Sequence, residues 1–377
     1  MARVFIRRAN VVVLAFLVLA VGYVGSAAAD PADDTAAWLN KIGSTRFGKP
    51  WTADTVRKAT YVSLSRAKPF EAEEIVHLRA MERLRSLSLD NPRFGDRELA
   101  VAGTLDTLVS LTIGKASVTN AGLAKLAGLK KLRRLNFSGA KVGADAMLEV
   151  AKIKSLTGLN LGTIKVADKG LAALGTLPKL RSIGMGSADG ITREGYATLA
   201  AMPALRTLNL VRVKLGPGFE ALGKAGQLRS IAVIRSNLDD AGAAVIGQIK
   251  TLTRVTIYNT QVGDKGVRAI AALPLLKTLS ISSTKATNES MKALAKAPNL
   301  IRLGIDNTVV TDAGIKHLAG ASGLRFLIAS RTRVGDASVE TLAGMKSLRF
   351  VSLGSSRLTA KGAATLKSLR PKMRVVH

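Results

Sequence analysis

Residues 300–323 read LIRLGIDNTVVTDAGIKHLAGASG, and the chain repeats the pattern of this stretch along most of its length. Leu303 and Ile305 alternate with other residues, which is the period of a short strand with one buried face. Ile315 and Leu318 lie three residues apart, as on one face of a helix, and a hydroxyl-rich turn separates the two elements. One unit of the pattern is therefore a strand, a turn and a helix.

The leucine that opens each unit recurs every 24 residues, apart from one interval of 25 and one of 23. A fixed period of this length is the sequence signature of a solenoid. A degenerate unit with Ala59, Val62 and Leu64 precedes the series, and a truncated strand with Met373 and Val376 follows it. The twelve opening leucines are Leu84, Leu108, Leu132, Leu156, Leu180, Leu205, Leu228, Leu252, Leu276, Leu300, Leu324 and Leu348.

The unit resembles the leucine-rich repeat from about Ala59 to the C-terminus. The VTDAGI segment at residues 310–315 resembles the ribonuclease-inhibitor-like and F-box-associated type of repeat, which bacterial exported proteins also carry. The resemblance implies an α/β fold, namely a right-handed leucine-rich-repeat solenoid or horseshoe. A parallel sheet would line its concave side, and short helices would cover its convex side. Repeat families host many unrelated activities, so the resemblance does not name a partner.

The first 29 residues have the pattern of a secretory leader. A positive start precedes an apolar run over residues 11–24, and three alanines stand before Asp30. The apolar run is shorter than the roughly 20 residues that a membrane span prefers. We therefore expect residues 1–29 to be a signal peptide and the protein to be exported, to the periplasm or outside the cell. A membrane anchor is the alternative if the leader is retained.

Residues 30–58 precede the repeats and hold both tryptophans, Trp38 and Trp51. The first turn of a solenoid has no neighbour to cover its open end, so a short helix with large aromatic side chains is the expected remedy. We therefore predict an N-terminal helical cap over residues 30–58 and the repeat solenoid over residues 59–377.

The composition narrows the possible functions. The 377 residues carry a formal net charge of +30 and contain no cysteine, which excludes disulfides, thiol catalysis and a lipid anchor on Cys. The histidines, His77, His317 and His377, lie in distant repeats and form neither a catalytic dyad nor a metal set. We therefore expect a non-enzymatic, monomeric protein without metal, cofactor or small-molecule substrate.

Most repeats carry an acid or an amide where the helix begins, and calcium binding is one interpretation of this column. Each member lies on a different turn, so an ion would not find the roughly six to eight oxygen ligands it needs. Such residues are also favoured at helix N-termini, so we interpret the column as helix capping. Its members are Asp96, Asn120, Asp168, Asp240, Asp264, Asn288, Asp312 and Asp336.

Gly184-Met185-Gly186, followed by Gly190, superficially resembles a phosphate-binding loop. The spacing does not match such a loop. Two of these glycines fall where the strand after Leu180 faces outward. We interpret the segment as a repeat variant with little side chain.

The ninth position of each repeat differs between the two halves of the chain. The leucine-rich-repeat family usually has Asn or Cys there, bonded to the backbone of adjacent turns. Hydroxyls can satisfy buried backbone groups and alkyl groups cannot, so we expect the C-terminal half to be the more stable one. The first six repeats carry Pro92, Ala116, Ala140, Ile164, Ala188 and Val213, and the last six carry Ser236, Thr260, Thr284, Thr308, Thr332 and Ser356.

A basic residue follows the opening leucine in eight repeats and would line one rim of the horseshoe. The simple explanation is solubility together with favourable charge near the preceding helix C-terminus. The functional alternative is a track for a polyanion, such as an acidic envelope glycan, a lipid headgroup or nucleic acid. Aromatic residues are scarce along the rim, which disfavours single-stranded nucleic acid. The rim residues are Arg85, Arg133, Arg181, Arg206, Arg229, Lys277, Arg325 and Arg349.

The outward positions of the strands form the concave face, which is the usual binding surface of this family. In the first repeats these positions are mostly small: Ser86, Ser88, Ser110, Thr112, Gly158, Asn160, Gly162 and Ser182. Larger residues follow, and large apolar residues beside arginine have the composition of binding hot spots. We therefore predict a protein-binding patch on the C-terminal half of this face, made of Arg254, Tyr258, Arg302, Phe326, Ile328 and Phe350.

A purely structural explanation stays open for two members of this patch. Phe326 and Phe350 could instead shield the last turns together with Val375 of the terminal strand. The favoured function is recognition of a protein partner on the concave face, and the alternative is polyanion binding along the rim.

Overall fold

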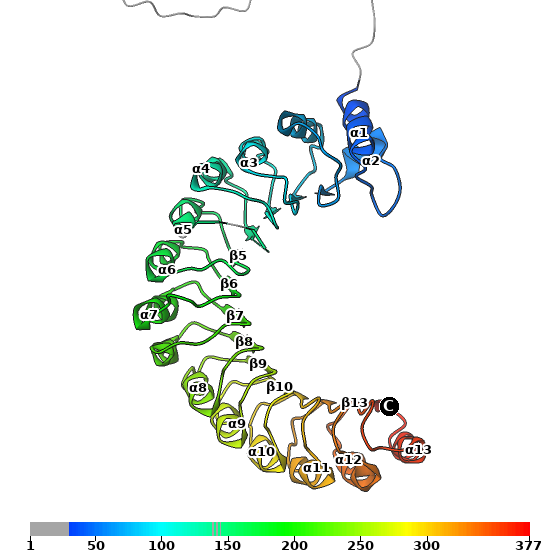
Figure 1. The fold of residues 1–377 in the computed structure, drawn as a ribbon. Helices are drawn as coiled ribbons and strands as arrows, with labels where there is room; N and C mark the ends of the chain where they lie inside the picture. Colours follow the sequence, from blue (N-terminus) through cyan, green and yellow to red (C-terminus); the bar gives the residue numbers. More distant parts are fainter. Residues whose placement is uncertain (1–29, 138, 141, 144) are drawn as a thin grey trace, which may run out of the picture.

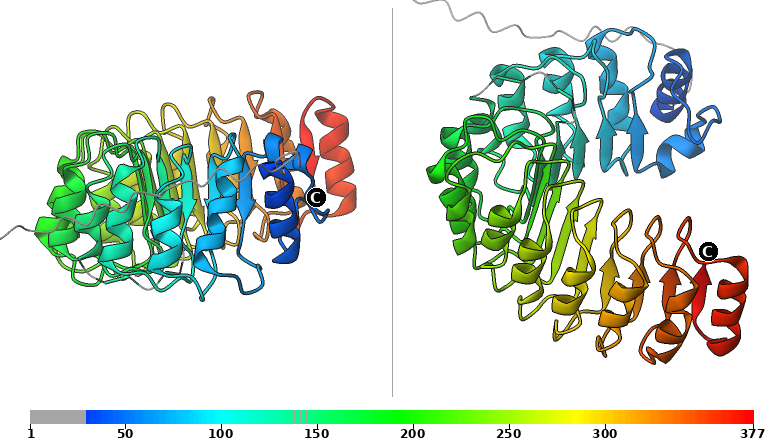
Figure 2. Two further views of the ribbon diagram at one scale, coloured as in Figure 1. Left: turned by 90° about the horizontal axis from the view of Figure 1, so that it is seen from above. Right: turned by 60° about the horizontal axis from the view of Figure 1, so that its bottom comes forward.

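The computed structural model describes residues 30–377 except 138, 141 and 144. The predicted signal peptide lies outside the described residues. The described chain is one curved stack of strand–helix units (Figure 1). Its strands form a single 14-stranded sheet in sequence order, and every described pairing is parallel. The sheet lines the inside of the arc and the helices cover the outside (Figure 2), which confirms the predicted solenoid.

The strands are short, and the longest ones lie in the middle of the chain. They are β1 (Tyr61–Ser63), β2 (Ser86–Ser88), β3 (Ser110–Thr112), β4 (Arg134–Asn136), β5 (Gly158–Asn160), β6 (Ser182–Met185), β7 (Thr207–Val211), β8 (Ser230–Ile234), β9 (Arg254–Tyr258), β10 (Thr278–Ser282), β11 (Arg302–Gly304), β12 (Phe326–Ile328), β13 (Phe350–Ser352) and β14 (Arg374–Val376).

The helices are also short. A 3₁₀ helix, labelled η, replaces the α-helix at η1 and η3 and adjoins one at η2 and η4. In chain order, the helices are α1 (Pro31–Lys41), α2 (Ala53–Lys58), η1 (Ala72–Ala80), α3 (Asp96–Ala102), α4 (Asn120–Ala124), η2 (Lys125–Gly128), α5 (Ala146–Val150), α6 (Asp168–Gly175), α7 (Arg193–Ala201), η3 (Phe219–Lys224), α8 (Asp240–Ile246), α9 (Asp264–Ala271), α10 (Asn288–Leu294), α11 (Asp312–Leu318), η4 (Asp336–Ser338), α12 (Val339–Gly344) and α13 (Ala360–Leu369).

One continuous apolar core runs between the sheet and the helices, from Ala32 to Val375. The twelve opening leucines are all buried, with no more than 2% of their surface exposed. Each unit buries its leucines against the units before and after it, so the core belongs to the stack and not to any single repeat. This arrangement holds adjacent strands in register, with each residue beside the residue one repeat further on.

The terminal strand differs from its predicted phase by one residue. In β14, Val375 pairs with the core residue Val351 and is buried, whereas Val376 is 38% exposed. The repeat pattern predicts core positions at Met373 and Val376; Met373 is buried, but the prediction for Val376 is wrong. Arg374 takes the outward position beside Phe350, because the strand follows the register of β13.

The residues before the first strand pack on the open end of the stack. Trp38 of α1 is buried, and its ring stacks on His77 and meets Phe70 edge-on, each with ring centroids 5.5 Å apart. Trp51 is also buried, and its indole N–H donates to Ser44 (3.3 Å). These aromatic contacts remove the apolar end of the first turn from water.

The column of acids and amides links neighbouring repeats. Asp264, the first residue of α9, accepts hydrogen bonds from the backbone N–H (2.9 Å) and the hydroxyl (2.8 Å) of Thr287, the N-cap of α10. It also accepts from the N–H of Ser290 (3.1 Å) and from its hydroxyl. Interpreting the column as caps of the members' own helices is therefore wrong for every member except Asn120, because the other side chains bond the start of the next helix instead.

These cross-repeat links are unevenly distributed along the described chain. Two lie in the first half and five follow one another without a gap in the second. The early links are Asp96–Thr119 and Asp168–Thr192, and the later ones are Asp240–Gly263, Asp264–Thr287, Asn288–Thr311, Asp312–Gly335 and Asp336–Thr359.

The ninth-position hydroxyls bond within their own turns. Thr284, Thr308 and Thr332 each donate to the backbone carbonyl three residues earlier, at 2.7 Å. The hydroxyl of Ser236 accepts from the N–H of Leu238 (3.2 Å). The alkyl residues at the same place in the first six repeats offer neither a donor nor an acceptor.

We predict that the N-terminal half of the solenoid opens more readily than the C-terminal half. It lacks the ninth-position hydroxyls and has fewer cross-repeat links, so local opening breaks fewer hydrogen bonds there. Native-state hydrogen exchange, resolved by repeat, measures this difference. We expect lower protection over residues 84–215 than over residues 252–358. Equal or higher protection of the first range would show that neither feature controls local stability.

Candidate functional site

Four of the predicted patch residues lie together near the C-terminal end of the concave face. The register of β11 to β14 places Arg302, Phe326, Phe350 and Arg374 side by side in one column. Ile328 stands one position further along β12, between Gly304 and Ser352 of the neighbouring strands. We call Arg302, Phe326, Ile328, Phe350 and Arg374 the aromatic patch.

The side chains of this column stack on one another. The guanidinium carbon of Arg302 lies 4.2 Å from the ring centroid of Phe326. The rings of Phe326 and Phe350 follow at 6.4 Å between centroids, and the guanidinium of Arg374 lies 5.8 Å from the Phe350 ring. Two arginines thus flank two aromatic rings, an arrangement that favours both apolar and anionic contacts from outside.

Arg374 was not among the predicted site residues, although it follows Phe350 by one repeat length of 24 residues. With Val376 assigned to the core, Arg374 is placed on the inward side of the last strand, so the sequence pattern does not identify it as an outward residue. The same correction bears on the shielding explanation, since Val375 faces the core and does not cover the phenylalanines. Phe326, Ile328 and Phe350 are half-buried rather than fully exposed, because neighbouring side chains cover part of each.

Arg254 and Tyr258 lie apart from the aromatic patch. Thr278 separates Arg254 from Arg302 in the register of the sheet. Tyr258, 38% exposed, ends β9 beside Ile234 of β8, which in turn pairs with Val211 of β7. Tyr258 therefore belongs to an apolar row in the middle repeats. Arg254 stays in the outward column of Arg302, Phe326 and Phe350, as the period predicts, but two strands away from Arg302. Of the six predicted residues, Tyr258 alone therefore lies in neither this column nor the adjacent row of Ile328.

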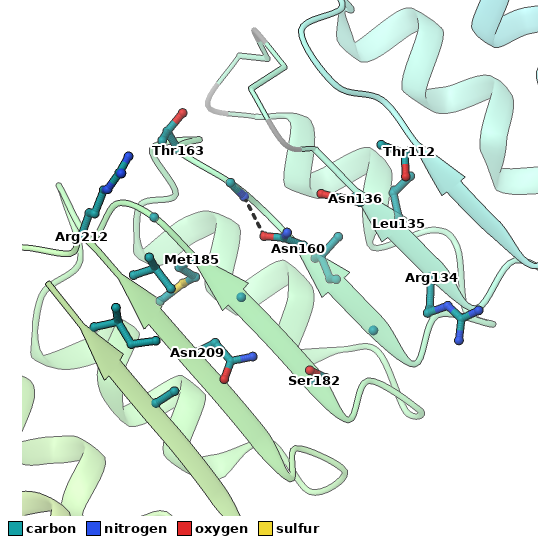
Figure 3. A pocket seen from close by; sticks show the side chains of 18 of the residues that line it. Thr112, Arg134, Leu135, Asn136, Asn160, Thr163, Ser182, Met185, Asn209 and Arg212 are labelled. Carbon is teal, nitrogen blue, oxygen red and sulfur yellow. Dashed lines mark hydrogen bonds between the residues drawn. The ribbon is translucent and has the colours of Figure 1, made fainter. Parts of the chain in front are cut away.

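The middle repeats enclose a hollow of about 900 Å³ on the concave face (Figure 3). Its floor includes Gly158, Ser182, Gly184 and Ala232, and the row of Val211, Ile234 and Tyr258 bounds one side. Reading the Gly184–Gly186 segment as a mere repeat variant missed this feature, because the segment lines the hollow. The available signal was the run of small outward residues between larger ones.

The rim residues stand one position before their strands, as the period predicts. Seven are exposed and Arg206 is half-buried. Arg206 donates to the carbonyl of Pro203 (2.9 Å) and Arg229 to that of Thr251 (3.1 Å). None of the eight takes part in an ion pair with another described residue. The rim therefore carries uncompensated positive charge.

Two further properties concern the described residues only. No three His, Asp or Glu side chains among them lie close enough together to hold a metal ion. None of the helices they form is long and apolar enough to cross a membrane.

Comparison with known proteins shows that this chain resembles solved structures in its fold. No protein-family model and no curated protein sequence matches the chain. An internalin from Listeria monocytogenes superposes with a TM-score of 0.56 at 19% identity, covering 92% of this chain and 94% of that one. The TLR13–ssRNA13 complex gives a TM-score of 0.60 at 17% identity, and the match covers 85% of this chain and 49% of that one. These neighbours are leucine-rich-repeat proteins, so the fold is a leucine-rich-repeat solenoid.

Proposed function

We propose that this protein is a non-enzymatic binding scaffold that recognises a protein partner through the aromatic patch. The observation that carries the proposal is the stacked column of Arg302, Phe326, Phe350 and Arg374. Aromatic residues and arginine are enriched in the hot spots of protein interfaces, where a few side chains carry most of the binding energy.

The energies favour a binding role over a purely structural one. An exposed cation–π contact contributes only about 0.5–1 kcal/mol. Leaving two phenylalanines and an isoleucine partly in water forgoes a larger gain, since burying the remainder of each apolar side chain releases about 25 cal/mol per Å². A partner that covers the apolar side chains of the patch recovers this energy.

The basic rim supports a second candidate function, the binding of an acidic envelope polymer. Its eight cations form no ion pairs with described residues, and the whole chain carries a formal net charge of +30. Binding of this kind weakens steeply with salt, because a polyanion releases counterions when cations neutralise it. Contacts through apolar surface do not weaken in this way.

Capture from an envelope extract at two salt concentrations tests the proposed function. The protein without residues 1–29 is immobilised, and the bound material is washed at about 0.05 M and then about 0.5 M salt, which shortens electrostatic screening to a few Å. We expect a protein that stays bound in high salt. Material that is only glycan or lipid and leaves in high salt would assign the function to the rim.

We also propose that the protein is exported with its leader removed. The three alanines before Asp30 and the short apolar run before them support cleavage there. N-terminal sequencing of the protein from a bacterial host is expected to begin at Asp30. A full-length chain in the membrane fraction would instead show that the leader is a retained anchor.

A further inference from the structure

We propose that the hollow of the middle repeats is a second binding site, for an acidic oligosaccharide. Its lining residues come from β3 to β9 and the turns after them, whereas the aromatic patch lies on β11 to β14. The two sites share no residue, so this proposal stands or falls independently of the proposed protein partner.

The hollow exists because one column of the sheet lacks long side chains. Gly184 stands in register between Asn160 and Asn209, and Ala232 follows on β8. Beside them, a Cβ atom on Gly186 would approach the carbonyl oxygen of Gly162 to 2.6 Å, so no larger residue fits there. The space is therefore built into the backbone and is not a gap left by one mobile side chain.

The charge around the hollow has a single sign. Arg134, Arg212 and Arg235 line it, and none of its lining residues in the described chain is an acid. The three guanidinium groups make no ion pair or hydrogen bond with described residues. Arg134 and Arg212 stand at opposite corners of the hollow (Figure 3). A guanidinium binds a carboxylate or phosphate through two parallel hydrogen bonds, so the charge favours an anionic ligand.

The surface between the arginines carries amides. Asn136, Asn160 and Asn209 project from β4, β5 and β7 (Figure 3). The N–H of Gly162 donates to Oδ1 of Asn160 (3.1 Å), which orients that amide and leaves its NH₂ group without a described partner. The Asn209 amide has no hydrogen-bond partner in the described chain. A side-chain amide both donates and accepts, which matches hydroxyl groups that also do both.

Other ligands fit the hollow less well. An extended peptide commonly adds a strand at a sheet edge, and β3 to β9 are all interior strands with no free edge. Single-stranded nucleic acid needs several aromatic stacking surfaces, and only Tyr258 supplies one here. An acidic sugar chain uses all three features, namely the cations, the amides and one ring face.

Fluorescence anisotropy with labelled oligogalacturonate tests the site in the protein lacking its leader, at about 0.15 M salt, where screening reduces contacts of exposed charges. We expect saturable binding that drops at least about tenfold in Arg134→Gln and in Arg212→Gln, which corresponds to about 1.4 kcal/mol. Ala232→Trp fills the hollow without changing the charge, and we expect the same loss. Lys316→Gln removes one equal charge from the convex helix α11, outside the hollow and the rim, and is expected to change the affinity less than about twofold.

Three outcomes would overturn the proposal. One is equal loss in Lys316→Gln, which would mean general charge attraction. Another is equal binding of the methyl-esterified oligomer or of a poly-glutamate peptide of the same length, which would remove the specificity for an acidic sugar. The last is unchanged binding in Ala232→Trp. Circular dichroism melting of each variant separates loss of the site from loss of the fold.

Discussion

Arg302→Ala is expected to weaken binding of the protein partner by about 10- to 100-fold while leaving the melting temperature nearly unchanged. Hot-spot truncations cost about 1–3 kcal/mol of binding energy, which gives this range. Arg302 is exposed and contributes to the fold mainly through its contact with Phe326, 4.2 Å away. An exposed contact of this kind is worth only about 0.5–1 kcal/mol. Binding should therefore suffer more than stability.

Arg254→Ala is the matched control for this measurement. Arg254 occupies the same outward column and is also exposed, but Thr278 separates it from the stacked rings. Titration of the captured partner by surface plasmon resonance compares the two variants. Equal loss in both would indicate that charge alone matters, and no loss in Arg302→Ala would move the site away from the aromatic patch. Phe350→Ala separates the remaining explanations, because a structural cap would lower the melting temperature and a hot spot would lower the affinity.

Asp264→Ala is expected to lower the free energy of unfolding by about 1.5–3 kcal/mol, the range for hydrogen bonds to a charged group. The carboxylate accepts from Thr287 and Ser290 of the next repeat, and Ser290 is fully buried. Removing it leaves those donors without a partner. Asp239→Ala is the control, because among the described residues the Asp239 side chain accepts only from Gly242, at the start of its own helix, and a lost cap costs about 1 kcal/mol. Urea denaturation followed by circular dichroism measures both.

The same carboxylate makes stability depend on pH. Burial raises the pKa of Asp264, but the hydrogen bonds from Ser290 and Thr287 outweigh burial and hold the pKa below its ordinary value of 3.8. Its contribution is therefore fully present above that value and is lost as the pH falls through the lowered pKa. The difference in stability between the parent and Asp264→Ala should shrink in acid. The measurement extends below about pH 3, which is about one unit under the ordinary pKa of an Asp side chain. A difference in stability that stays constant from neutral pH to this acidic range would contradict this account.

Much of the architecture could be predicted because a constant repeat length determines which residues are neighbours. The 24-residue interval places Arg302 beside Phe326 and Phe326 beside Phe350, and the sheet has that register. At the end of the chain the leucine pattern is incomplete and no longer shows which residues face the core. For this reason Val376 was assigned to the core, and Arg374 was not recognised as an outward residue.

Other features depend on which neighbours a side chain contacts, and the repeat length does not determine these contacts. The sequence identifies Asp264 as a residue at the start of a helix, but only the three-dimensional packing shows that it bonds the following repeat. Likewise, small residues such as Gly184 show where side chains are missing. Whether the space is filled by neighbours or remains a hollow depends on the curvature of the stack.

Site-specific photo-crosslinking tests the central claim, that a protein partner docks on the C-terminal part of the concave face. A photoreactive amino acid replaces Ile328 within the aromatic patch or, as the control, the exposed Lys316 on the convex helix α11. The protein is irradiated in intact cells and the products are identified by mass spectrometry. The account predicts one dominant protein adduct from position 328 and none from position 316. An adduct of the same protein from position 316 alone would contradict it.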